Sequence, residues 1–79
     1  MSILPSITAK ELMSALFKAD FVIIRQSGSH VRLQHKIDHI RQTTVPLHSG
    51  DVPRWLVREI LRQACISIPD FLRFLKESN

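Results

Sequence analysis

The chain has 79 residues, enough for one small domain whose core must use most of its apolar side chains. Apolar residues make up 44% of the sequence, too many for a disordered chain, and no apolar run is long enough to span a bilayer. Lysine and arginine number 11 against 7 aspartate and glutamate residues, and the net charge of +4 favours polyanionic partners. The beginning of the sequence lacks the features of a secretory signal, so we expect a cytoplasmic protein without a membrane segment.

The first predicted helix covers residues 8–19 and follows an extended leader over residues 1–7. Thr8 and Glu11 have the three-residue spacing of a capping box, in which each side chain bonds the backbone of the other residue. Apolar residues then recur at helical spacing, which predicts an amphipathic helix.

Three strands are predicted in the middle of the chain. Residues 21–26 are rich in β-branched and aromatic side chains, and residues 29–35 alternate between apolar and polar side chains. A polar connection over 36–41 leads to a third strand at 42–47. Pro46 has no backbone N–H to donate, so we expect this third strand at an edge of the sheet.

The alternation in the second strand predicts which side chains face water. If Val31 and Leu33 face the core, His30 and Arg32 face outward, because successive side chains of a strand point to opposite faces. The turn signal at Gly28 precedes this strand and makes a hairpin with the strand before it.

A loop at residues 48–51 leads to the second predicted helix, residues 52–65, which Asp51 could cap. This helix has a buried stripe and a basic ridge: Val57, Ile60, Leu61 and Ala64 form the stripe, and Arg54, Arg58 and Arg62 the ridge. A final helix is predicted over residues 70–77. The order α-β-β-β-α-α predicts an α+β fold, with one meander sheet covered by helices on one face.

The chain has four histidines: His30, His35, His39 and His48. No two have the i, i+4 spacing of helical metal ligands, and carboxylates near them are sparse. The single cysteine, Cys65, excludes an internal disulfide and a site built from several thiolates. We therefore expect neither a metal nor another cofactor.

His30 is the sharpest candidate for chemistry. It follows Gly28, where a phosphate can approach the backbone closely, and it lies among the cationic side chains of Arg25, Arg32 and Lys36. Two interpretations stay open at this point. His30 is either a surface histidine that happens to follow a turn or a general base held beside a phosphodiester.

The basic ridge of the second helix also has two interpretations. It is either a solvated helix face or a second surface for phosphate groups, and the sequence does not say whether it adjoins the hairpin. Trp55, in the first turn of the same helix, either stacks on a base or packs against protein.

At this point the chain resembles the HicA-type mRNA interferase toxins of toxin–antitoxin pairs. The resemblance covers roughly residues 8–75 and is carried by "KEL", "FVIIRQSGSHVRLQH", "TTVPLH" and "REILRQA", in this order. It implies a fold like the double-stranded-RNA-binding domain, α-β-β-β-α with a three-stranded antiparallel sheet, here extended by a short extra C-terminal helix. The whole chain, residues 1–79, is then a single HicA-like domain.

The resemblance also implies an activity, a site and partners. The family's catalytic histidine stands in Gly-Ser-His, which corresponds to His30. The expected function is a metal-independent endoribonuclease that cleaves mRNA with His30 as general base on the ribose 2′-hydroxyl. The expected inhibitor is a HicB-type antitoxin, and a homo-oligomer is considered within the toxin–antitoxin complex. Residues expected to contact RNA are Arg25, Gly28, Ser29, Arg32 and Lys36, and His48 is considered as an accessory acid. The alternatives are a non-catalytic RNA-binding module and a protein-interaction subunit of the same fold.

Two departures from the family pattern stand out. Trp55 and Leu56 follow Arg54 where the family commonly has Gly-Thr, and Cys65 replaces the glycine that usually follows "RQA". The second departure removes the residue best suited to a left-handed helix end.

Overall fold

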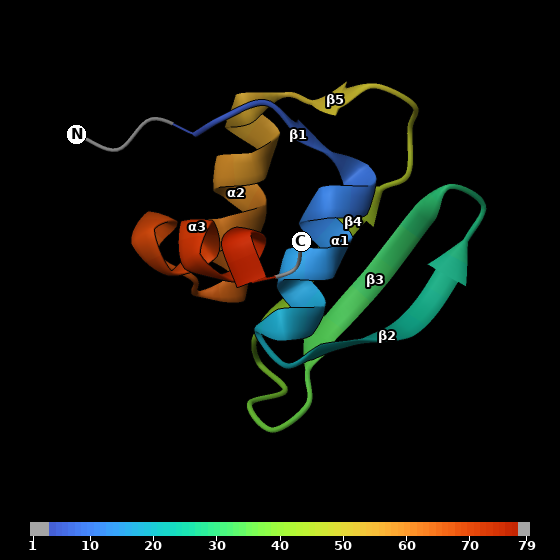
Figure 1. Ribbon diagram of the computed structural model, residues 1–79. Coiled ribbons are helices and arrows are strands. Elements are labelled where there is room, and N and C mark those ends of the chain that lie inside the picture. Colours follow the sequence, from blue (N-terminus) through green and yellow to red (C-terminus); the bar gives the residue numbers. More distant parts are fainter. Residues whose placement is uncertain (1–3, 78–79) are drawn as a thin grey trace.

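The computed structural model describes residues 4–77 and has the expected α+β architecture (Figure 1). Three helices and a three-stranded antiparallel sheet follow in the predicted order, with two additional short strands. The elements are β1 (Ile7–Thr8), α1 (Ala9–Lys18), β2 (Phe21–Ser27), β3 (His30–His35), β4 (Gln42–Pro46), β5 (Asp51–Val52), α2 (Arg54–Ala64) and α3 (Ile68–Glu77).

The capping box at the start of α1 is confirmed. The Thr8 hydroxyl accepts a hydrogen bond from the Glu11 backbone N–H at 3.1 Å, and the Glu11 carboxylate accepts one from the Thr8 backbone N–H at 3.0 Å. These bonds satisfy donors that a helix start otherwise leaves open. The backbone and hydroxyl hydrogen bonds from Thr8 hold the pKa of Glu11 below its usual range.

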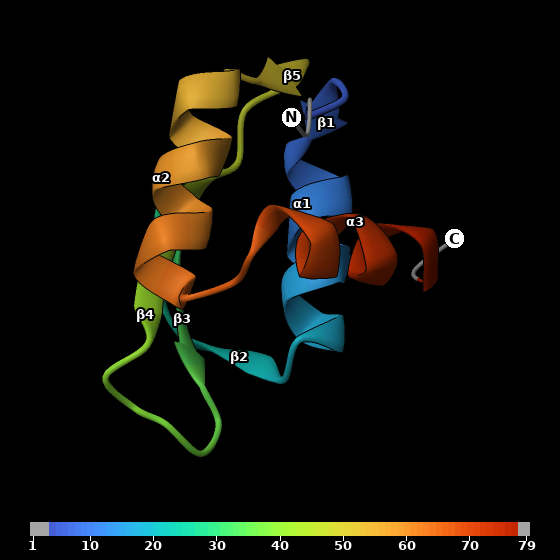
Figure 2. The ribbon, with the colours of Figure 1, turned by 90° about the vertical axis from the view of Figure 1, so that its left-hand side faces the viewer.

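The sheet has the order β2-β3-β4, so the prediction of an edge position for the third strand is confirmed. Val31 and Leu33 are buried, whereas His30 and Arg32 are exposed, as the alternation predicts. α1 and α2 pack on the face that carries Val31 and Leu33, and α3 packs against α1 (Figures 1 and 2). No described element covers the opposite face, to which His30 belongs.

The predicted leader is only partly correct. Residues 1–3 lie outside the described residues, but Leu4 and Ile7 are buried in the core. Ile7 pairs with Val52, so β1 and β5 form a separate two-stranded sheet that the sequence did not reveal. In so small a chain the core must recruit apolar side chains from the segment before the first helix.

The predicted cap at Asp51 is wrong. Asp51 lies in β5, and Pro53 occupies the N-cap of α2 without any side-chain hydrogen bond. Pairing with β1 fixes the backbone at Asp51 in an extended strand, two residues before the position from which a side chain could cap the helix.

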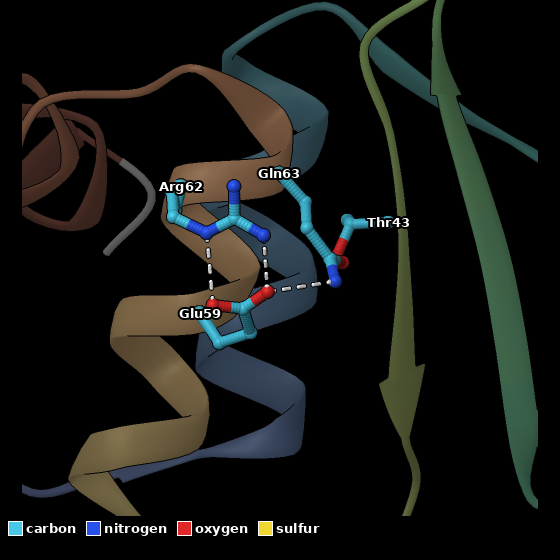
Figure 3. Close-up of polar contacts among 4 residues, drawn as sticks. All are labelled: Thr43, Glu59, Arg62 and Gln63. Carbon is cyan, nitrogen blue, oxygen red and sulfur yellow. Dashed lines mark hydrogen bonds and ion pairs between the residues drawn. The ribbon is translucent and has the colours of Figure 1, made fainter.

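The buried stripe of α2 is confirmed in full and faces the sheet. Figure 3 shows how the helix is attached to β4: the hydroxyl of the fully buried Thr43 donates a hydrogen bond to Gln63 at 2.8 Å. Glu59 accepts hydrogen bonds from Gln63 at 3.2 Å and from Arg62 at 2.6 and 2.9 Å. This network spans one turn of α2 and ties it to the strand.

The final helix is longer than predicted, because it begins at Ile68 rather than at residue 70. Pro69 is tolerated in a first turn, and the Ser67 hydroxyl accepts a hydrogen bond from the Asp70 backbone N–H at 3.2 Å. Phe71 is fully buried, so α3 contributes a large side chain to the same core as the sheet.

Candidate catalytic site at the tip of the hairpin

The structure brings two of the four histidines together. The rings of His30 and His48 lie 6.3 Å apart between centroids, in an edge-to-face arrangement with an angle of 86°. Both side chains are exposed, and both line a pocket of about 310 Å³. This pairing joins the candidate base with the candidate accessory acid.

The hairpin turn presents His30 at the first position of β3. Ser27 pairs with His30, and Gly28 and Ser29 form the two-residue turn between them. Gly28 has a φ of +58°, which a residue with a side chain adopts only with strain. A glycine at the first turn position is typical of a type II′ hairpin turn. An added Cβ at Gly28 would meet no atom within 4 Å, so the glycine serves the turn and leaves open space beside it.

The position of His48 follows from backbone pairing. Pro46 pairs with His30, and the Leu47 backbone N–H donates a hydrogen bond to the Ser29 carbonyl at 2.6 Å. This bond continues the contact between β4 and the hairpin one residue beyond the strand. His48, the next residue, is therefore held beside His30 although it lies in a loop.

The remaining pocket wall comes from segments that sequence reasoning did not assign to the site. Its residues are Gly50, Asp51, Val52, Pro53 and Leu56, from the end of the loop, β5 and the first turn of α2. The β1–β5 pairing holds this wall in place, and nothing in the spacing of the sequence signals that pairing. The start of α2 has no acidic residue in its first turn, and the carboxylate in this wall belongs to Asp51, two residues before the N-cap.

Two arginines lie next to His30 on the open face of the sheet. Arg25 pairs with Arg32 across β2 and β3, so both project from the same face as His30. Arg32 is two residues along β3, a separation of about 7 Å. Its guanidinium donates hydrogen bonds to Gln42 at 2.8 and 3.2 Å and to Thr44 at 3.1 Å. These bonds hold the planar group against β4.

Lys36 lies at the other end of the hairpin. It follows the last residue of β3, and six residues of strand separate it from His30 by about 20 Å. Its ammonium group forms an ion pair with Asp20 at 3.3 Å. The structure therefore does not bring Lys36 together with the histidine pair.

The other two histidines stabilise local structure. His35 contacts Phe21 edge-to-face at 5.4 Å, and its Nδ1 accepts hydrogen bonds from the backbone N–H groups of Ile37 and Asp38. His39 lies in the loop between β3 and β4 and contacts the Lys36 carbonyl. Within residues 4–77, no three side chains of the types that ligate metals converge on one point.

The basic ridge of α2 is largely engaged within the protein. Arg54 donates a hydrogen bond to the Leu4 carbonyl at 2.8 Å, and Arg62 is bound to Glu59. The hydrogen bond from Arg62 lowers the pKa of Glu59, and the same bond raises the pKa of Arg62. Only Arg58 of the three has no hydrogen bond or ion pair to another described residue, which favours the interpretation as a solvated helix face.

A comparison with protein families adds an independent observation. The model of a family described as "HicA toxin of bacterial toxin-antitoxin" matches residues 9–66. The chain belongs to the HicA toxin family. A search of the curated proteins found no match to it. Membership makes the chain a toxin of a toxin–antitoxin system and implies an antitoxin partner.

The HicA family match runs from α1 to just beyond α2 and includes both histidines of the pocket. α3 lies outside the matched residues. Cys65, inside them, ends α2 with a left-handed φ of +57°, so the helix of this HicA protein keeps the left-handed end without a glycine. Trp55, the other departure, is 69% exposed in the first turn of α2. Among the described residues, no helix has the length and apolar character needed to cross a membrane.

Proposed function

We propose that this HicA toxin is a metal-independent endoribonuclease that cleaves mRNA at the His30–His48 pocket. The observation that carries the proposal is the pair of exposed imidazole rings 6.3 Å apart on a backbone that holds both. Two imidazoles on opposite sides of one phosphate can act as base and acid in the same displacement.

The proposed reaction is a transfer within the RNA backbone. His30 takes the proton of a ribose 2′-hydroxyl, and the resulting oxygen attacks the adjacent phosphorus. The bond from phosphorus to the 5′-oxygen of the next nucleotide breaks, and protonated His48 gives its proton to that oxygen. The products are a 2′,3′-cyclic phosphate and a free 5′-hydroxyl.

The ring separation supports this division of roles. Each reacting oxygen must come within about 3 Å of an imidazole nitrogen. The pocket that both rings line opens to solvent through exposed side chains, and its volume of about 310 Å³ is enough for a phosphate and part of a ribose.

The cationic groups have graded roles in the proposal. Arg32 and Arg25, one step along the open face, stabilise the charge that grows on the phosphoryl oxygens. Gly28 and Ser29 contact the RNA through their backbone at the turn, where the RNA strand approaches closely. Lys36, about 20 Å away, binds a flanking phosphate rather than the one that is cleaved.

The decisive experiment compares the wild type with His30→Ala on a defined RNA in EDTA, followed by analysis of the new ends. We expect the wild type to produce cyclic phosphates and the variant to lose cleavage while keeping RNA affinity within a few-fold. His39→Ala is the matched control, because it removes an exposed histidine from the loop between β3 and β4, outside the pocket.

The outcomes separate the rival functions. Cleavage of an all-deoxy strand would refute the mechanism, since it requires the 2′-hydroxyl. RNA binding without cleavage by the wild type indicates a non-catalytic RNA-binding module. Binding to a HicB-type antitoxin with no RNA affinity at low salt indicates a protein-interaction subunit, for which the exposed Trp55 is a candidate contact.

A further inference from the structure

An apolar groove runs along α1 on the helix side of the sheet. Its volume is about 540 Å³, and its apolar lining consists of Ala9, Met13, Phe17, Ile23, Val31 and Leu47. Three of these side chains are large and substantially exposed, with 47% of Phe17, 47% of Ile23 and 38% of Leu47 open to solvent. Apolar side chains gathered in one concave surface mark an interaction site more strongly than the same residues scattered singly.

The groove exists because the helices cover only part of their face of the sheet. Phe21, at the start of β2, is buried under the helical layer. Ile23 pairs with the fully buried Leu33 and shares its face, yet Ile23 remains half exposed. In Figure 1 the β2–β3 hairpin projects beyond α1.

The charge around the groove indicates an acidic partner. No carboxylate lines it, and its polar rim carries Lys10 and His48. Of the acidic side chains on the flanking elements, Glu11 accepts hydrogen bonds from Thr8 and Asp20 is paired with Lys36, whereas Asp51 lines the adjoining histidine pocket rather than the groove. On a chain of net charge +4, this rim attracts a partner that offers carboxylates around an apolar centre.

A second copy of the chain does not fit these observations. Two copies would bring two charges of +4 together, with Arg25, which has no ion pair to another described residue, on the exposed β2 edge of each. The pairing of β2 with β3 is also interrupted between Ile23 and Arg25, and such irregularities discourage edge-to-edge pairing of sheets.

The groove and the histidine pocket share one residue. His48 lines both, with Leu47 and Ser49 on the groove side and Pro46 and Gly50 on the pocket side. A protein seated in the groove therefore contacts His48 and stands at the mouth of the pocket.

We propose that the α1–β2 groove docks an acidic protein that inserts apolar side chains between Phe17 and Ile23, and that the antitoxin restrains the toxin from this position. The docking part rests on the groove alone. The restraint part rests on the proposed nuclease function. In this arrangement the antitoxin blocks RNA by occupying the space beside His48 and needs no contact with the open face of the sheet.

The test uses two groove variants, Phe17→Glu and Ile23→Glu, each of which removes an apolar contact and repels an acidic partner. The matched control is Ile40→Glu, an equivalent change at a loop residue that is 92% exposed and outside the groove. The probe is the purified cognate HicB-type antitoxin, with affinity measured by calorimetry and folding checked by thermal unfolding.

We expect each groove variant to bind the antitoxin about 30-fold more weakly or worse, as for a central interface residue. Ile40→Glu should stay within about threefold of the wild type. The groove variants should cleave RNA at the wild-type rate but escape inhibition. Unchanged antitoxin affinity in folded Phe17→Glu and Ile23→Glu would overturn the docking site. If the wild type cleaves no RNA, the nuclease fails while the affinity measurements still decide on the groove.

Discussion

Replacing His48 with alanine tests whether His48 acts as the general acid while His30 acts as the general base. His48 is exposed in a loop, and within residues 4–77 His30 is the one aromatic residue whose ring it contacts. Its removal should therefore leave the stability of the fold unchanged within about 0.5 kcal/mol, the usual range for surface substitutions. Any large loss of activity then reports on the reaction itself.

The expected magnitude follows from the role of a general acid. The two rings, 6.3 Å apart, line the same pocket, so a phosphate bound there has one imidazole for each reacting oxygen. A positioned acid contributes about 100-fold to 10,000-fold, so His48→Ala should slow cleavage at least 100-fold, or about 2.7 kcal/mol in activation free energy. If His48 takes no part in the reaction, His48→Ala should change the cleavage rate by less than about threefold.

Single-turnover cleavage of a defined RNA in EDTA measures this loss across a range of pH. A base and an acid working together give a bell-shaped profile, because the rate falls at low pH when the base is protonated and at high pH when the acid has lost its proton. His48→Ala should lose the fall at high pH. His39→Ala, in the loop between β3 and β4, should match the wild type.

A second substrate isolates the protonation of the leaving oxygen. A nucleoside 3′-(4-nitrophenyl phosphate) releases nitrophenolate, which needs no proton to leave. On this substrate His48→Ala should recover most of the wild-type rate, whereas His30→Ala should remain inactive. An unchanged rate and pH profile for His48→Ala on RNA would refute the acid role and leave His30 acting alone.

Three further predictions concern RNA binding and stability. Arg25→Gln should weaken RNA binding and should lower the slope of log K against log salt concentration by about one. Lys36→Gln should change the cleavage rate little, because Lys36 is far from the histidines and is paired with Asp20. Filter binding at several salt concentrations measures the slopes. Equal losses of cleavage in the two variants would contradict the assignment of Arg25 to the cleaved phosphate and of Lys36 to a flanking one. Cys65→Gly should raise the free energy of unfolding by about 1 kcal/mol, since glycine adopts the left-handed φ of +57° without strain. If denaturant melts show a lower free energy of unfolding instead, the contacts of the thiol side chain matter more than the backbone conformation. Glu11→Ala should destabilise the protein more at pH 7 than at pH 3. The hydrogen bonds from Thr8 lower the pKa of Glu11, so its stabilisation is present at neutral pH and is lost as the pH falls below the ordinary value of about 4.3. Equal losses at both pH values in thermal melts would contradict this.

The local structure of this protein is largely determined by its sequence. The capping box of Thr8 and Glu11, the alternation around Val31 and the stripe of α2 each depend on contacts within a few residues, and all three are present. Short-range hydrogen bonds and the periods of helix and strand decide such features before the chain folds. The outward direction of His30 follows from the same period of two.

The tertiary structure decided what surrounds His30. The pairing of β1 with β5, the bond from Leu47 to Ser29 and the approach of His48 all join segments far apart in the chain. The same long-range pairing moved Asp51 from a helix cap into a strand. Contacts of this kind depend on how the whole core closes, because the entropy lost in closing a long loop is recovered only when the distant segments pack together. The sequence thus determined that a histidine would project from the hairpin, and the packing of the core determined that it has a second imidazole beside it.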